Sequence, residues 1–201
     1  MKKNKAISDI EPMLVKAYGR EAAGQIMPRA QKEFEALCAE NAQEPKAVRA
    51  HTWESVYPCI AFYRALQQEG IKKEDAYTFL FDAFAARAEK GAAQMRTLFK
   101  LPGLYKLMPF FWKVVTKSSY GEAAGFKYSF YPTGRDRVKF DMTECTYCRT
   151  FERYGCRELT SIFCHLDDVN NENLHPKLLW NRSKTMGAGA DCCDFDVIVK
   201  H

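Results

Sequence analysis

The sequence predicts an α+β fold, in which a helical N-terminal part is followed by a small, mainly antiparallel β-sheet crossed by a helical segment. Two observations lead to this prediction. Apolar residues recur at helical spacing through residues 1–120, and after Gly121 the spacing changes to a period of two. We therefore expect a helical part over 1–120 and a β-β-α-β-β part over 121–201, together forming one compact unit.

The helical part divides into three long stretches and a shorter, irregular pair. The first stretch covers 9–42 and contains Pro28, where we predict a break or kink because proline has no N–H to donate. Two further stretches cover 50–70 and 72–100. Prolines and a glycine interrupt the pattern over 102–117, which predicts the irregular pair there.

The second part begins with a hairpin signal. Apolar residues alternate with polar ones in two short runs separated by the turn residues "PTGRD". The apolar positions of the two runs are Phe126, Tyr128 and Phe130, then Val138, Phe140 and Met142. The segments "KLLWNRSKTM" and "CDFDVIVK" predict two more strands, joined by the glycine-rich "GAGAD".

Composition narrows the functional classes. Hydrophobic residues make up 47% of the chain, which is ordinary for a globular protein. The net charge of +5 arises from basic residues scattered among acidic ones, and no nucleic-acid-binding motif accompanies it, so we expect no nucleic-acid partner.

The N-terminal sequence and the most apolar segment bear on localisation. No apolar run of a secretory signal follows the first basic residues, so we expect a cytoplasmic protein. The segment 98–115 is interrupted by lysines and prolines and cannot be an integral membrane helix. A helix pair packed on the core is the simplest interpretation, and a membrane-surface role is the alternative.

Eight cysteines are present, four of them within 145–164. In the cytoplasm they are expected to stay reduced, which argues against a disulfide framework. The Cys145-Thr-Tyr-Cys148 motif, placed between a strand and a helix start, is compatible with a thiol–disulfide oxidoreductase. No βαβ unit precedes it, however, as it would in a thioredoxin-like protein.

Zinc is a second possibility for the cysteines. The spacing from Cys145 to Cys164 matches no common zinc finger, but a site assembled from distant segments needs no short motif. Cys145, Cys164 and Cys193 with Asp167 would provide acceptable zinc ligands. The simplest interpretation of any single cysteine is a small buried hydrophobic side chain.

Helix and strand geometry selects which of these residues can meet. Cys164 and Asp167 are three residues apart and share one face of a helix. Cys193 has the phase of the buried face of its strand, so Cys192 should point away. An unbroken helix would hold Cys145 far from Cys164, so we predict a break at Gly155. We then expect Cys145, Cys164, Asp167 and Cys193 around one pocket between the crossing helix and the sheet.

The histidines give weaker signals. His165 follows Cys164 directly, and one residue along a helix turns a side chain about 100° away, so a Cys–His dyad is not expected from this pair. His51, His175 and His201 have no recognisable partner in the sequence, and we expect them at the surface or in loops.

Four segments in order resemble one known family. They are "YPCIAFYRAL" (57–66), the Cys-x-Tyr of 145–147, "FCHLD" (163–167) and "NRSKTMGAGADCCDF" (181–195). Together they are similar to the L-2-amino-thiazoline-4-carboxylic acid hydrolase family over about residues 50–200. The positions that match the family pattern are Cys145, Cys164, Asp167, Arg182, Thr185, Gly189, Cys193 and Asp194. Cys148, Cys156 and Cys192 lie outside that pattern.

The resemblance implies a hydrolase that opens a cyclic amidine or thiazoline carboxylate, a small-molecule substrate. Such a reaction needs a nucleophile, an acid for the departing atom and a cation for the carboxylate. The implied catalytic residues are Cys193, Cys164, Asp167 and Cys145, and the implied substrate-binding residues are Arg182, Thr185, Gly189 and Asp194. Within these sets, Cys193 or Cys164 is the expected nucleophile or a ligand of a water-activating metal.

Each of the other implied roles has a specific residue. Asp167 is the expected proton carrier and Arg182 the expected carboxylate clamp. Gly187 and Gly189 would allow backbone N–H groups to approach a ligand, although a plain turn is the commoner use of such glycines. The rival functions are a small-molecule sensor or carrier without turnover, with or without zinc, and an oxidoreductase that uses Cys145 and Cys148.

Overall fold

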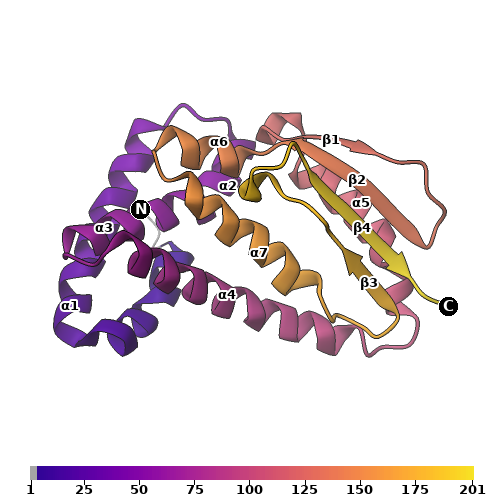
Figure 1. The fold of residues 1–201 in the computed structure, drawn as a ribbon, viewed down its shortest axis with the longest axis horizontal. Helices are drawn as coiled ribbons and strands as arrows, with labels where there is room; N and C mark the ends of the chain where they lie inside the picture. Colours follow the sequence, from indigo (N-terminus) through magenta and orange to yellow (C-terminus); the bar gives the residue numbers. More distant parts are fainter. Residues whose placement is uncertain (1–3) are drawn as a thin grey trace.

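The computed structural model describes residues 4–201, and its helices come first in the chain (Figure 1). The α-helices are α1 (Lys5–Glu40), α2 (Lys46–His51), α3 (Tyr57–Gln68), α4 (Lys73–Leu98), α5 (Met108–Ser119), α6 (Thr146–Arg153) and α7 (Thr160–Asn171). The strands are β1 (Lys127–Phe130), β2 (Arg137–Glu144), β3 (Leu178–Asn181) and β4 (Cys193–Val199). Single turns of 3-10 helix cover Leu104–Leu107, Glu122–Ala124, Arg157–Leu159 and Met186–Ala188, and a π-helical turn covers Thr52–Val56. The predicted α+β fold is confirmed.

The first helix departs from the prediction in one respect. α1 continues through Pro28, and the residue inside it with a non-helical backbone is Gly19, with φ 82° and ψ 167°. The break predicted at Pro28 is therefore wrong. Glycine reaches a positive φ without steric cost, which other residues do not, so the chain changes direction at Gly19.

The four strands form one sheet in the order β1-β2-β4-β3, with every neighbouring pair antiparallel. Strand periodicity divides its side chains between two faces. The inner face is apolar, and the paired residues Phe140 and Phe195 stack there with ring centroids 4.7 Å apart. The outer face is polar, and the Arg137 guanidinium binds the Asp196 carboxylate on it at 2.7 Å.

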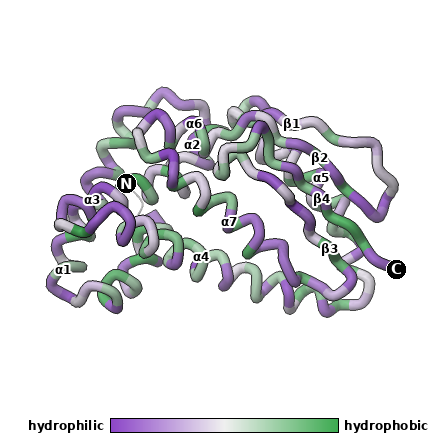
Figure 2. The backbone as a smooth tube through the Cα atoms, viewed as in Figure 1, coloured by the Kyte–Doolittle hydropathy of each residue, from purple (hydrophilic) through white to green (hydrophobic). Residues whose placement is uncertain are grey.

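Helices α5 and α7 cover the inner face. From α5, the Trp112 ring lies 5.4 Å from the Trp180 ring and 6.0 Å from the Phe195 ring, and its indole N–H donates to Asn171 of α7 at 3.1 Å. The crossing segment predicted from the sequence therefore shares this face with α5, the last helix of the predicted helical part. α7 changes from hydrophobic to hydrophilic along its length (Figure 2), so its C-terminal half brings polar groups to the sheet.

The helical segment between β2 and β3 is broken where the sequence predicts it. Gly155 has φ 69°, and its N–H donates to Glu152 O while Cys156 N–H donates to Phe151 O. This pair of bonds is the Schellman motif that ends a helix. α6 and α7 are therefore separate helices, and α7 can return toward the start of α6.

Apolar side chains form two clusters. One lies between α1, α3, α4 and α7 and is built around residues such as Ile10, Tyr57 and Phe62. The other lies between the sheet and α5 and contains Phe140, Cys145 and Cys193. Within residues 4–201, no helix combines the length and apolar composition needed to cross a membrane.

Candidate active site

A small cavity lies where α5, α6, α7 and the inner face of the sheet meet. Its volume is about 50 Å3, which is room for a few water molecules. Cys145, Cys164, Asp167 and Cys193 all border it. The four side chains that the sequence predicts around one pocket are thus brought together.

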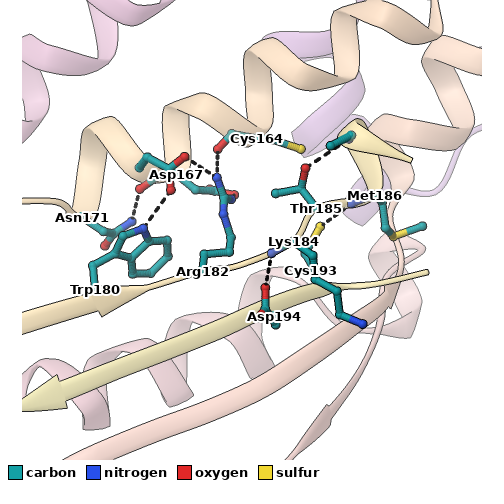
Figure 3. A network of polar contacts seen from close by, with 12 residues as sticks. Cys164, Asp167, Asn171, Trp180, Arg182, Lys184, Thr185, Met186, Cys193 and Asp194 are labelled. Atoms are coloured by element: carbon teal, nitrogen blue, oxygen red, sulfur yellow. Dashed lines mark hydrogen bonds and ion pairs between the residues drawn. The ribbon is translucent and has the colours of Figure 1, made fainter. Parts of the chain in front are cut away.

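Cys164 has the most polar surroundings of the four. Its side chain points from α7 toward Thr185 (Figure 3). The pKa of its thiol is lowered by a hydrogen bond with Cys193, and further by the Gly187 backbone N–H, the Thr185 hydroxyl and the Arg182 guanidinium, against the opposing effect of burial. These groups stabilise a thiolate at Cys164.

Gly187 is essential to this arrangement. A Cβ added at residue 187 would lie 2.7 Å from the Cys164 sulfur and 3.2 Å from the Ser161 backbone nitrogen. Only a residue without a side chain lets the backbone N–H come this close to the sulfur. The sequence predicts that Gly187 allows such an approach, but to a ligand rather than to a cysteine.

The other two cysteines at the cavity are poorer thiolates. Cys193 accepts a hydrogen bond from the Met186 N–H at 3.2 Å, but its pKa is raised, chiefly because it shares a hydrogen bond with Cys164. Burial raises the pKa of Cys145 to about 12, although the nearby Cys148 and Tyr147 backbone N–H groups lower it. Cys145 is therefore ill suited to start a Cys145–Cys148 redox cycle, because the thiolate is the reactive form.

Asp167 lies one turn beyond Cys164 on α7. Burial raises the pKa of its carboxyl group to about 7, against the lowering effect of Arg182. The side chain keeps 39% of its surface accessible. It does so because it borders the cavity on one side and a groove on the other. A carboxyl group with this pKa can both give and take a proton near neutral pH.

Arg182 is held firmly behind this pair. Its side chain is 3% exposed, and its guanidinium donates to Asp167 Oδ2 at 3.0 Å, to Asp168 Oδ2 at 2.5 Å and to Cys164 O at 2.5 Å. Trp180 adds a hydrogen bond from its indole N–H to Asp168 Oδ1 at 2.9 Å. With three acceptors already bound, Arg182 is placed to orient Asp167. A role as carboxylate clamp would require it to exchange a partner.

The remaining predicted binding residues, Thr185, Gly189 and Asp194, lie in the β3–β4 connection or at the start of β4. Thr185 borders Cys164 and also accepts the Ala188 N–H at 3.1 Å. Gly189, with φ 91°, ends the short 3-10 turn in the left-handed conformation. Asp194 projects from the side of β4 opposite Cys193, and its carboxylate accepts the Ser183 and Lys184 backbone N–H groups at 2.9 and 2.7 Å. It therefore holds the connection in shape from outside the cavity.

Two hydroxyl groups at the cavity have no partner among residues 4–201. Thr116 of α5 and Thr160 of α7 are both 1% exposed, and neither side-chain oxygen makes a hydrogen bond there. Both residues line the cavity. Because a buried hydroxyl without a partner is costly, these two groups favour a polar molecule inside. The sequence gives no signal for them, since both occur in segments that read as ordinary helix.

His51 corrects a prediction. It is 9% exposed rather than at the surface, with Nδ1 2.9 Å from the Tyr147 hydroxyl and Nε2 2.7 Å from Ser119 O. The carbonyl can only accept, so Nε2 carries the proton and Tyr147 donates to Nδ1. Burial lowers the pKa of His51. Tyr147 borders the cavity, so its hydrogen bond with His51 helps to fix one wall of the cavity.

A larger groove of about 520 Å3 adjoins the cavity on the α4 and α5 side. It shares Trp112, Tyr120 and Asp167 with the cavity, and most of its other walls are apolar. Its size falls in the usual range for small-molecule sites. The three shared side chains form the boundary between the groove and the cysteines.

The geometry offers no ready metal centre. Across the described part of the chain, no three His, Cys, Asp or Glu side chains are grouped so that they could hold a metal ion. The zinc site formed by Cys145, Cys164, Cys193 and Asp167, which the sequence left open, therefore has no support in this arrangement.

Among solved structures, similar chains include H-NOX proteins. The H-NOX domain of Shewanella oneidensis in its Fe(II)CO state is 14% identical, with a TM-score of 0.36 over 98% of this chain and 97% of that one. The unliganded Fe(II) H-NOX protein of K. algicida is 9% identical, with a TM-score of 0.34 over 98% and 95%. Scores and identities this low establish neither a common fold nor a common ligand. No match was found among curated protein sequences.

The family comparison is more informative. The model of the L-2-amino-thiazoline-4-carboxylic acid hydrolase family matches residues 49–197. That range contains His51, all four cavity residues predicted from the sequence, and the whole sheet except the last two residues of β4. Because the match covers most of the chain, the protein belongs to the L-2-amino-thiazoline-4-carboxylic acid hydrolase family.

Proposed function

We propose that this protein is a hydrolase that opens a small cyclic amidine or thiazoline carboxylate, with Cys164 as nucleophile and Asp167 as proton carrier. The observation that carries the proposal is the thiol of Cys164, whose pKa is lowered by hydrogen-bond donors that converge on its sulfur. Family membership supplies the substrate class. An activated thiolate beside a carboxyl group that titrates near neutral pH is a suitable pair for ring opening.

In the first step, the Cys164 thiolate attacks the ring carbon that lies between sulfur and nitrogen. A bond forms between the Cys164 sulfur and this carbon, and the bond from the carbon to the ring sulfur breaks. Asp167 gives its proton to the departing sulfur, which becomes a thiol. The ring is now open and is attached to Cys164 as an isothiourea.

In the second step, water attacks the same carbon and Asp167, now a carboxylate, takes a proton from it. The bond to Cys164 breaks, and the sulfur leaves as the thiolate. The released product carries a urea group and a free thiol, and both protein groups return to their starting states. One water molecule is consumed in total.

The surrounding residues have supporting roles in this proposal. Arg182 orients Asp167 through the 3.0 Å bond between them. Thr116 and Thr160 are the natural partners of the water or of the polar edge of the ring, because their hydroxyls lack other partners within residues 4–201. Cys193 donates its S–H to the Cys164 thiolate.

Substrate access is assigned to the groove. The cavity of about 50 Å3 is smaller than a substituted five-membered ring, so a wall side chain must move when the substrate arrives. Trp112 and Tyr120 separate the groove from Cys164 and are the side chains placed to move. Cyclic substrates would therefore approach Cys164 past Asp167.

Direct assay tests the proposal. The purified protein is incubated with L-2-amino-thiazoline-4-carboxylate, and the ureido thiol product is measured by liquid chromatography with mass detection. We expect turnover by the wild type and loss of about 10³-fold or more in Cys164→Ser. Cys156→Ser is the matched control, because Cys156 lies in the helical cluster away from the cavity, and it should retain activity.

Two results would overturn the assignment. Undiminished turnover by Cys164→Ser would exclude Cys164 as nucleophile. Absence of turnover on a panel of cyclic amidines and thiazolines, with saturable binding of one of them, would favour a binding module instead. The specific observation in favour of that second function is the groove, which is large enough to hold a ligand without any reaction at Cys164.

A further inference from the structure

The outward side of α5 is unusually apolar. Its inward residues Met108, Trp112 and Thr116 pack toward the sheet, as expected for a helix that covers a core. A helix at a protein surface normally turns polar side chains outward. Here the outward positions hold Phe110, Phe111, Val114 and Val115, which are 63%, 43%, 46% and 46% exposed.

The exposed apolar surface extends beyond α5. Leu101 and Leu107, in the turn before the helix, are 56% and 47% exposed, and Met95 and Leu98 at the end of α4 are 39% and 45% exposed. We call these eight residues the apolar face: Met95, Leu98, Leu101, Leu107, Phe110, Phe111, Val114 and Val115. Monomeric proteins seldom expose so many large apolar side chains from one continuous segment unless the surface binds something.

Charge on the same segment has a single sign. Residues 90–121 contain six basic residues and no acidic residue, although the whole chain has 30 basic and 25 acidic ones. Within residues 4–201, no ion pair involves Lys100, Lys106, Lys113 or Lys117. At about 100° per residue, Lys113 and Lys117 fall along one edge of the apolar side of α5.

Three kinds of partner can be considered for this surface: a second copy of the chain, nucleic acid and a lipid bilayer. Its charge and its apolar side chains together distinguish between them. A symmetric dimer through this face would bring the same unpaired lysines of two copies together, and like charges repel. Nucleic acid would be attracted to the lysines, but it gives the exposed phenylalanines and valines nothing to bury against. An anionic bilayer satisfies both features, because it accepts apolar side chains below a negatively charged surface.

We propose that the apolar face binds the surface of an anionic lipid bilayer, with α5 lying parallel to it. Phe110, Phe111 and their neighbours enter the region between headgroups and acyl chains, while Lys106, Lys113 and Lys117 contact lipid phosphates. The groove beside the cavity is lined in part by Met95, Leu98, Phe111 and Val115 of the same face. Docking therefore turns the mouth of the groove toward the lipid.

Vesicle binding tests this proposal without any need for turnover. The full-length protein is centrifuged with vesicles of phosphatidylcholine alone and of phosphatidylcholine mixed with phosphatidylglycerol. We expect binding to the mixed vesicles, weakened by salt and much weaker without the anionic lipid. The double variant Phe110→Ser/Phe111→Ser should lose affinity by about tenfold or more. Both side chains are exposed, so circular dichroism should show an unchanged fold.

Lysine variants distinguish binding through the apolar face from attraction of the whole positively charged protein to anionic lipid. Lys113→Gln/Lys117→Gln should lose affinity by about fivefold for each lysine. Lys16→Gln/Lys32→Gln removes two exposed positive charges from α1 and should change affinity little.

Three outcomes would overturn the proposal. One is the absence of binding to any vesicle. The second is equal loss in both lysine pairs with no effect of the phenylalanine variant, which would mean attraction by net charge alone. The third is a dimer in analytical ultracentrifugation that dissociates in the phenylalanine variant, which would make this face a contact between copies of the chain.

Discussion

Cys164 at the cavity and three cysteines in the helical cluster are all largely enclosed by protein, but their thiols differ in chemistry. Cys38, Cys59 and Cys156 lie in the helical cluster, and burial raises the pKa of each. Cys164 at the cavity is also largely enclosed, yet its pKa is lowered. The amount of burial therefore does not decide how readily a thiol ionises.

The difference lies in the groups that face each sulfur. Cys156 is directed at a backbone carbonyl, Phe151 O, at 3.5 Å, and carbonyl oxygens do not stabilise a negative charge. Cys164 instead faces donors: the Cys193 thiol, a backbone N–H and a hydroxyl, with a guanidinium nearby. Donors that converge on a thiolate replace the water lost on burial. The cavity differs from the helical cluster because its walls include a loop whose backbone N–H groups, those of Met186 and Gly187, bond to cysteine sulfurs.

The largest contrast between the two regions should appear in thiol reactivity. With limiting iodoacetamide near neutral pH, we expect Cys164 to be alkylated about 10³-fold faster than Cys38. The reason is that Cys164 is largely a thiolate there, whereas the pKa of Cys38 is raised to about 12. Peptide mass spectrometry at successive times measures both rates in one sample. Equal alkylation rates at Cys164 and Cys38 would show that the cavity does not activate its thiol.

Gly187→Ala should make the thiol of Cys164 less reactive and more like the thiols of the helical cluster. The added methyl would meet the Cys164 sulfur at 2.7 Å, so the sulfur must move away from the Gly187 N–H. We expect alkylation of Cys164 at neutral pH to slow by about 10- to 100-fold as its pKa rises. Gly24→Ala is the control, because a Cβ there meets nothing within 4 Å, and its Cys164 rate should equal that of the wild type. An unchanged rate in Gly187→Ala would show that this N–H does not stabilise the thiolate.

Asp167→Asn should reduce the pH dependence of the free energy of unfolding. The folded-state pKa of Asp167, about 7, is above its ordinary value of 3.8, so the folded state holds this proton more tightly than the unfolded state. Its contribution to stability is therefore complete at low pH and is lost as pH rises toward about 7. Denaturant titrations at pH 5 and pH 8 should show a smaller pH difference in the variant than in the wild type. In the proposed reaction, the variant should also lose most of its turnover, because an amide can neither give nor take the proton.

The smallest effect is expected where the two regions join. Tyr147 packs against both apolar clusters, and its hydroxyl bonds His51 Nδ1 at 2.9 Å. Tyr147→Phe leaves that nitrogen without its partner and should lower the free energy of unfolding by about 1 kcal/mol. Tyr128→Phe serves as the control, since no hydrogen bond of its hydroxyl occurs within residues 4–201. A larger loss in the control would mean that the effect comes from packing rather than from His51.

The parts of the site that the sequence predicts are those set by local periodicity. Cys164 and Asp167 share a helix face, Cys193 has the phase of the inner strand face, and Gly155 is suited to end a helix. Each of these follows from three or four neighbouring residues. The α+β fold is predictable for the same reason, because the change from helical to strand spacing is visible in the sequence alone.

The parts that the sequence does not predict depend on segments far apart in the chain. His51 is hydrogen-bonded to Tyr147, 96 residues away in the sequence, and Trp112 to Asn171, 59 residues away. The hydroxyl of Thr116 gives no signal, since a threonine on a helix usually bonds within its own turn. The sequence predicts the break in α1 at Pro28 instead of Gly19 because proline is the stronger local helix breaker, whereas a glycine inside a helix can also keep helical angles.

The glycine beside Cys164 also gives a rule for reading other members of the family. A relative with any larger residue at the position of Gly187 cannot hold a cysteine sulfur against that backbone N–H, even if every other motif is intact. Such a chain would keep the sheet, the cavity and the family resemblance, but its thiol would be ordinary. One position without a side chain thus separates relatives that can share this chemistry from relatives that share only the fold.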